Sequence, residues 1–206
     1  LAINFSSGEL QVGLREKSGK AIVEFDSCPV LVASINALLP AIKSLLGSLQ
    51  CRRELGHIEI VAGDDGSVGF LLRVVTTLEA EDERLVCDFS KRYQCVFYVA
   101  EGRDVAAIRV LSERRQLAYQ LQNAQTIEFT PADFIQGNAT VNRQLVTCVI
   151  DWLMLDGEQR VLELYAGIGN FSAAIASVCK QLVLLEGVAA MVERAKSWID
   201  ANQFAH

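Results

Sequence analysis

Apolar and polar residues alternate in short runs over the first two thirds of the chain, as in β-strands that bury one face. The pattern predicts nine short strands: 1–5, 10–15, 21–25, 57–61, 68–75, 95–99, 107–111, 117–121 and 126–129. Two stretches have helical spacing instead: 30–49, which Pro40 should break or kink, and 78–93, whose acidic start suits a helix dipole. We therefore expect residues 1–128 to form an α+β domain with an antiparallel sheet and helices.

The hydrophobic pattern changes near Pro131. A helix, a buried strand, a short helix and a second strand are predicted over 138–154, 161–165, 170–178 and 181–185. A strand, a helix and a second strand in this order form half of a nucleotide-binding α/β unit. A helix ahead of the first strand is common in methyltransferases. We therefore expect residues 129–206 to be the N-terminal part of a Rossmann-like α/β domain of the class I methyltransferase type.

Small residues fill the turn after the first strand of this unit. Gly167 and Gly169 would let a cofactor approach the backbone, where the N-terminus of the next helix faces it. Glu186 ends the second strand, 17 residues after Gly169. A carboxylate there can accept hydrogen bonds from both ribose hydroxyls of a nucleoside cofactor. The alternative is an ordinary turn followed by an exposed glutamate.

The residues around this turn bear on which nucleoside would bind. A dinucleotide fingerprint requires a third glycine at position 172, and the residue there is Ser172. Glu163, near the end of the first strand, precedes Ala-Gly-x-Gly-Asn-Phe, and this combination favours S-adenosylmethionine over NAD. Because Gly-x-Gly and Glu186 would suit either cofactor, an NAD-dependent oxidoreductase stays open as an alternative.

Composition narrows the class of protein further. Hydrophobic residues make up 51% of the chain, yet no apolar run has the length of a membrane helix, so no membrane association is expected. The net charge of −6 offers no basic field that would by itself indicate nucleic acid, and no DNA partner is expected. The six cysteines form no Cys-x-x-Cys pair and no secretory signal is visible, which predicts reduced thiols in the cytoplasm and no zinc site.

Two longer motifs carry a resemblance to a known family. Residues 129–138 read Phe-Thr-Pro-Ala-Asp-Phe-Ile-Gln-Gly-Asn and resemble the Phe-x-Pro-x-x-Phe-x-Gln-x-Asn signature of the RNA uracil-5-methyltransferases. Residues 161–171 are similar to the cofactor loop of that family, Val-Leu-Asp-Leu-Phe-Cys-Gly-x-Gly-Asn-Phe. The loop departs from this pattern at Glu163, Tyr165 and Ala166. The resemblance covers nearly the whole chain and is closest to members that make 5-methyluridine in bacterial 23S ribosomal RNA.

The resemblance implies roles for particular residues. Gln136 would bond the methionine end of S-adenosylmethionine, Glu186 would bind the ribose, and Tyr165 would pack beside the cofactor. Three residues would form the loop under it: Gly167, Gly169 and Asn170. Residues 1–128 would contact the ribosomal RNA. Cys28, in Asp-Ser-Cys-Pro, matches the last of four cysteines that bind a [4Fe–4S] cluster in this family. The other three would lie before Leu1, so we expect no cluster in this chain by itself.

The resemblance also implies the chemistry. In this family a cysteine thiolate adds to uracil C6, C5 then takes the methyl group, and a carboxylate removes the C5 proton. The nucleophile lies in a Ser-Cys-Asn-Pro motif and follows an Asp-Pro-x-Arg motif, and this sequence has neither. Cys148 and Cys179 are interpreted as core residues, so no catalytic residue is assigned. We expect a fragment of a longer enzyme, inactive alone.

Two further expectations follow from the incomplete sheet. Only two strands of a methyltransferase sheet are predicted, so their faces would be uncovered in this chain. We expect the isolated chain to be marginally stable or to form a dimer through this surface.

A non-catalytic RNA-binding module with a vestigial cofactor loop stays open as a second alternative to the methyltransferase.

Overall fold

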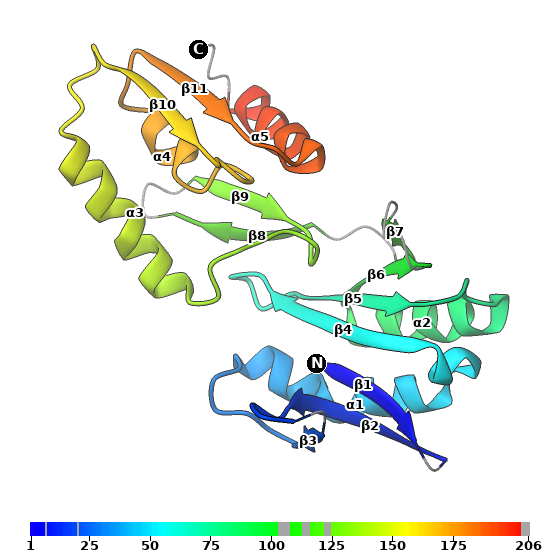
Figure 1. Cartoon of the computed structure of the whole chain (residues 1–206). Helices are drawn as coiled ribbons and strands as arrows, with labels where there is room; N and C mark the ends of the chain where they lie inside the picture. The colour runs from blue at the N-terminus through cyan, green and yellow to red at the C-terminus, as the bar shows by residue number, and fades with distance from the viewer. Residues whose placement is uncertain (7, 20, 103–107, 113–115, 122–124, 203–206) are drawn as a thin grey trace. The chain divides into compact units, whose positions relative to one another are not determined.

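The computed structural model describes residues 1–6, 8–19, 21–102, 108–112, 116–121 and 125–202. The chain divides into two compact units, Leu1–Leu117 and Ala118–His206, which are described separately (Figure 1). The division precedes the boundary expected at residue 128, because the strand pair formed from 117–129 groups with the second unit. Residues 114–115 and His206 lie outside the described residues.

The first unit contains one sheet and two long helices. Its strands are β1 (Ala2–Ser6), β2 (Glu9–Arg15), β3 (Ile22–Glu24), β4 (Leu55–Ala62), β5 (Val68–Val74), β6 (Val96–Glu101) and β7 (Ile108–Val110). Its helices are α1 (Ala33–Ser48), the short 3-10 helix η1 (Gln50–Arg53) and α2 (Ala80–Tyr93). The sheet has the order β3-β2-β1-β4-β5-β6-β7. These elements match the predicted strands and helices, with differences at their ends.

Two details of the first unit differ from the sequence predictions. The expected antiparallel sheet is mixed, because β5 and β6 pair in parallel. Helix α2 forms the connection between them, and a parallel pair requires a crossover of that kind. Of the effects predicted for Pro40, a break is wrong, because α1 is one helix that contains Pro40. Pro40 is exposed, whereas its neighbours Leu39 and Ile42 are fully buried, so packing stabilises the helix on both sides of it.

Both long helices pack on the same face of the sheet. The core combines Leu39 and Leu46 of α1 with Phe70 of β5, Phe97 of β6 and Phe89 of α2. The rings of Phe70 and Phe97 stack with centroids 5.3 Å apart. One buried polar group in this region is the carboxylate of Asp82, in the first turn of α2. It accepts hydrogen bonds from the backbone N–H groups of Gln50 and Cys51, at 2.7 and 2.9 Å, and so joins α2 to the start of η1.

The second unit contains two separate strand pairs and three helices. Its elements are β8 (Leu117–Gln120), β9 (Thr126–Phe129), α3 (Ala139–Leu153), β10 (Arg160–Leu164), α4 (Ser172–Ala176), β11 (Gln181–Leu185) and α5 (Ala189–Ala201). Strands β10 and β11 are parallel, with Val161 opposite Leu182 and Leu164 opposite Leu185. Helix α4 connects them, as the predicted strand–helix–strand pattern requires. Among the described residues, no helix is long and apolar enough to cross a membrane.

One face of the β10–β11 pair is exposed. The inner face, which includes Leu182, lies against α4, whereas the outer face has four large apolar side chains that are 46 to 58% exposed. These outer residues are Leu162, Leu164, Val183 and Leu185. Parallel sheets are usually covered on both faces, so this surface is incomplete in the described structure. On helix α3, Asn142 and Val146 form the buried side, whereas Val141, Leu145 and Trp152 are exposed.

The exposed outer face predicts self-association of this chain. We expect a dimer in sedimentation velocity experiments, because two such faces would exclude water from each other. Changing the paired residues together, Leu164→Lys and Leu185→Lys, should shift the population to monomer by placing two charges in the contact. Val30→Lys is the matched control, since Val30 is 86% exposed in the first unit. A monomeric unmodified chain with a sharp, high melting transition would contradict this prediction.

Candidate cofactor site

The loop after β10 has an unusual backbone conformation. Three of its residues have positive φ angles: Tyr165 at 58°, Gly167 at 60° and Gly169 at 95°. Glycine adopts such angles without steric cost, which explains the two glycines, whereas a tyrosine in this conformation is strained. The Ala166 N–H, two residues beyond β10, donates to the carbonyl of Leu185 at 3.2 Å, so the loop is hydrogen-bonded to the end of β11. The loop is therefore defined by its contacts as well as by its glycines.

Glu186 lies directly beside this loop. One carboxylate oxygen accepts from the Gly167 N–H and the other from the Val188 N–H, both at 2.8 Å. These backbone N–H groups, first that of Val188 and then that of Gly167, hold the pKa of the Glu186 carboxyl below its usual value. A carboxylate has about four acceptor positions, so two remain for other donors. The structure thus brings together Gly167 and Glu186, two of the residues predicted from the sequence.

Ser172, at the position where a dinucleotide fingerprint has its third glycine, uses its side chain in a buried hydrogen bond. Its side chain is fully buried at the start of α4, and its hydroxyl donates to Glu163 at 2.7 Å. Burial raises the pKa of Glu163, while the bond from Ser172 opposes this change. Glu163 points to the inner face of the β10–β11 pair, beneath the loop. The sequence indicated Ser172 only as a departure from the dinucleotide fingerprint, and gave no sign of this contact.

Asn170 does not extend into the open side of the loop. Its side chain exchanges two hydrogen bonds with the side chain of Asn142 on α3, at 2.8 and 3.0 Å. Its oxygen also accepts from the hydroxyl of Tyr119 on β8, at 2.9 Å. Asn170 therefore connects the glycine loop to α3 and β8. Sequence reasoning missed Asn142 and Tyr119, because both are distant in sequence from the loop and nothing in their own segments indicates the contact.

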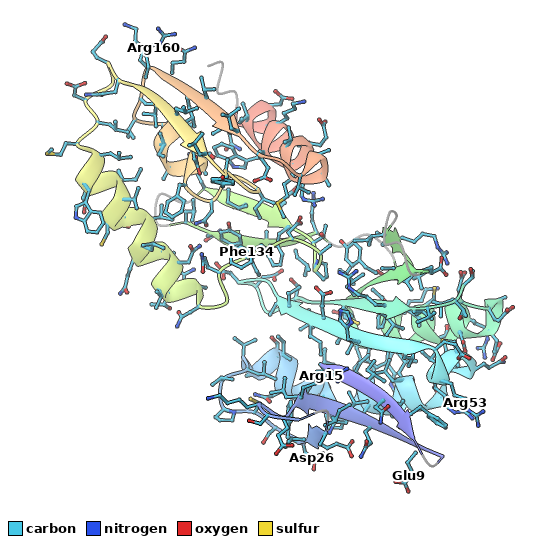
Figure 2. The ribbon with its side chains drawn as sticks, viewed as in Figure 1. Glu9, Arg15, Asp26, Arg53, Phe134 and Arg160 are labelled. Carbon is cyan, nitrogen blue, oxygen red and sulfur yellow. The ribbon has the colours of Figure 1, made fainter. Side chains whose placement is uncertain are left out.

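The segment between β9 and α3 contains the remaining predicted residue, Gln136. Its side chain is exposed and makes no hydrogen bond among the described residues. Asn138 caps α3 by accepting from the Val141 N–H at 3.0 Å. Phe134 in the same segment is 75% exposed, and it is labelled in Figure 2. Tyr165 is 90% exposed. Its packing beside a cofactor stays a prediction.

Cys28 belongs to the first unit. Its N–H donates to the side chain of Asn36 on α1 at 2.9 Å, and the Asn36 amide donates back to the Cys28 carbonyl at 2.9 Å. The loop before α1 is thus fixed around a half-buried thiol. No group of three or more metal-ligating side chains occurs within the described part of the chain. Of the two cysteines expected in the core, Cys179 is buried but Cys148 is exposed, so that expectation was wrong for Cys148.

The fold is similar to that of a solved RNA methyltransferase. The crystal structure of Pyrococcus abyssi tRNA (uracil-54, C5)-methyltransferase in complex with S-adenosyl-L-homocysteine matches with a TM-score of 0.68. The match covers 98% of this chain and 52% of that chain at 16% sequence identity. This likeness establishes a mixed α/β fold of the methyltransferase type.

Curated relatives with higher sequence identity are bacterial enzymes. The chain is 40% identical over 188 residues to the 23S rRNA (uracil(1939)-C(5))-methyltransferase RlmD of Photobacterium profundum, covering 91% of this chain and 39% of the relative. It is 36% identical over 206 residues to RlmD of Aliivibrio fischeri, covering 100% of this chain and 46% of the relative. The chain therefore spans less than half the length of these relatives.

A protein-family model gives the same assignment over nearly the whole chain. The model described as tRNA (Uracil-5-)-methyltransferase matches residues 9–206. This range includes both motifs on which the resemblance was based, at residues 129–138 and 161–171. The chain therefore belongs to the tRNA (uracil-5-)-methyltransferase family.

Proposed function

We propose that this chain is the part of an S-adenosylmethionine-dependent enzyme that binds the cofactor and meets the RNA. The complete enzyme would make 5-methyluridine in 23S ribosomal RNA in the cytoplasm. The observation that carries the proposal is the Glu186 carboxylate, which accepts from the Gly167 N–H and keeps acceptor positions for ribose hydroxyls. Residues 1–128 would contact the RNA, and residues 129–206 would begin the cofactor domain.

The residues of the site fit S-adenosylmethionine. Glu186 offers acceptors for a ribose, and Gln136 has an amide without a protein partner among the described residues, which can bond the methionine carboxylate or amine. Gly167 has no heavy atom within 4 Å of the position a Cβ would occupy, so the loop leaves open space there. Ser172 fills the third glycine position of a dinucleotide site and is bonded to Glu163, which argues against NAD.

The chemistry is divided between this chain and residues that it lacks. When bound, S-adenosylmethionine supplies an electrophilic methyl group on its sulfonium. This chain would orient that group through Glu186 at the ribose and Gln136 at the methionine end, with the glycine loop underneath. Activation of uracil C5 requires a thiolate that adds to C6 and a carboxylate base. The family motif that contains the thiolate is absent from this sequence.

The central test of the proposal is cofactor binding. By isothermal titration calorimetry, the chain should bind S-adenosylhomocysteine in preference to NAD. Glu186→Gln should weaken that binding roughly tenfold or more, because it removes a charged acceptor from the ribose and from the Gly167 N–H. Glu193→Gln is the matched control on α5, since Glu193 is exposed and pairs only with Lys196 among the described residues.

Two outcomes of the titration would oppose the proposal. Preferential binding of NAD would favour the oxidoreductase alternative. RNA binding without S-adenosylhomocysteine binding would favour a non-catalytic RNA-binding module with a vestigial loop. Either result would leave the family membership unchanged and would show that the site does not perform the proposed function.

The division of chemistry predicts that this chain alone transfers no methyl group. With radiolabelled S-adenosylmethionine and unmodified 23S ribosomal RNA, we expect no label in the RNA. RlmD of Photobacterium profundum is the positive control in the same assay. Methyl transfer by this chain that is abolished by Cys148→Ser would contradict the prediction, because it would place the nucleophile within this sequence.

Cys28 is proposed as one ligand of a [4Fe–4S] cluster in a longer polypeptide that supplies three further cysteines. The Asn36 contacts fix the Cys28 backbone, while the half-buried thiol makes no hydrogen bond within the described part of the chain. In such a polypeptide, Cys28→Ser should reduce the amounts of protein-bound iron and sulfide and should weaken the visible absorbance of the cluster. Cys87→Ser is the control, since that thiol donates to the Leu111 carbonyl at 2.8 Å. Equal iron content in both variants would exclude Cys28 as a ligand.

A further inference from the structure

A buried carboxylate lies within the segment that carries Gln136. The side chain of Asp133 is 1% exposed. One of its oxygens accepts from both the N–H and the hydroxyl of Thr130, at 2.7 and 2.9 Å, and the Asp133 N–H donates back to the Thr130 carbonyl at 3.0 Å. These bonds close the turn that follows β9. Gln136 comes three residues after this turn and two residues before Asn138, the cap of α3.

The second oxygen of Asp133 forms an ion pair with Arg194 of α5 through one terminal guanidinium nitrogen. The two residues are 61 positions apart, so the pair joins segments that are distant in sequence. The Arg194 Nε is also buried and has no acceptor within the described part of the chain. The Arg194 side chain is 30% exposed, and its guanidinium therefore depends on Asp133 to compensate for lost hydration.

The position of Arg194 relates this pair to the ribose end of the site. Helix α5 begins at Ala189, three residues after Glu186, and Glu186 itself bonds the Val188 N–H at the start of that helix. A shift of α5 would therefore move Glu186 and Arg194 together. The ion pair transmits the position of α5 to the turn before Gln136. At the other end of the segment, α3 is joined to the glycine loop through Asn142 and Asn170.

We infer that Arg194 and Asp133 are positioning residues that set the distance between Gln136 and Glu186. This inference rests on the proposed function, because it gives the pair a role only if one ligand spans both residues. The segment 134–137 has exposed or half-exposed side chains, so packing contributes little to its placement. Its two fixed ends, Asp133 and Asn138, then determine where the Gln136 amide lies. Neither Arg194 nor Asp133 is required to touch the ligand.

The test compares two ligands that differ only at the methionine end. S-adenosylhomocysteine extends from the ribose site to Gln136, whereas 5′-methylthioadenosine lacks the amino-acid group. In the whole chain, Arg194→Met should weaken S-adenosylhomocysteine binding about tenfold, the size of one misplaced charged hydrogen bond, and leave methylthioadenosine within about twofold. Arg194→Lys retains the charge and should recover part of the loss. Lys196→Met, on the same helix, is the matched control.

A double-variant cycle separates the pair from each residue alone. Asp133→Asn should lower the same affinity ratio, and the combination of Asp133→Asn with Arg194→Met should cost less than the sum of the two. Additive effects would overturn the inference. If Arg194→Met fails to fold, Arg194→Lys and Asp133→Asn carry the comparison of the two ligands.

The outcomes distinguish this inference from the proposed function. If the unmodified chain binds neither ligand, the proposed function fails, and the inference fails with it. If the unmodified chain binds both ligands and the variants weaken both equally, or neither, the inference alone is overturned, because the pair then has only a structural role. A loss confined to S-adenosylhomocysteine supports it.

Discussion

The hydrogen bond between the Glu186 carboxylate and the Gly167 N–H is the interaction on which the arrangement of the site depends. Parallel strands bring their carboxyl ends to one edge, and there the residue after β11 reaches the loop after β10. That loop includes a tyrosine with φ of 58°, a conformation that costs about 1 kcal/mol and needs compensation from its surroundings. The second bond of Glu186, to the Val188 N–H, orients the start of α5 as well. The Glu186 carboxylate thus connects the loop after β10, the loop after β11 and the start of α5 by hydrogen bonds.

Features that depend on neighbouring residues were predictable from the sequence. The strand–helix–strand pattern and the glycine turn were predicted because hydrophobic period and positive φ angles are properties of short segments. The acidic first turn of α2 was predicted for the same reason, and the helix begins at Ala80. The direction of strand pairing was harder to predict, because an alternating pattern does not say whether a strand pairs in parallel or antiparallel. The β5–β6 pair, parallel through α2, was therefore expected to be antiparallel.

Contacts between distant segments were not predictable. Asp82 appeared to be one of several acidic residues that favour a helix start, but it is fully buried and binds N–H groups 31 and 32 residues away. Asn142 and Asn170 are 28 residues apart, and nothing in either segment alone indicates the pairing of their amides. Helix α3 shows a related limit: periodicity identifies an apolar side, while burial depends on which element covers it.

The contacts of the cofactor loop lie within the second unit. The side chains that bond the loop all belong to the second unit: Glu186 follows β11, Asn142 is on α3 and Tyr119 is on β8. The exposed apolar face of the β10–β11 pair lies on the opposite side of the sheet from Glu163 and α4. Missing cover on that face would reduce stability by leaving apolar area in water, but it would remove none of these polar contacts. The arrangement of the cofactor loop and the cover of the sheet are therefore separable features of the second unit.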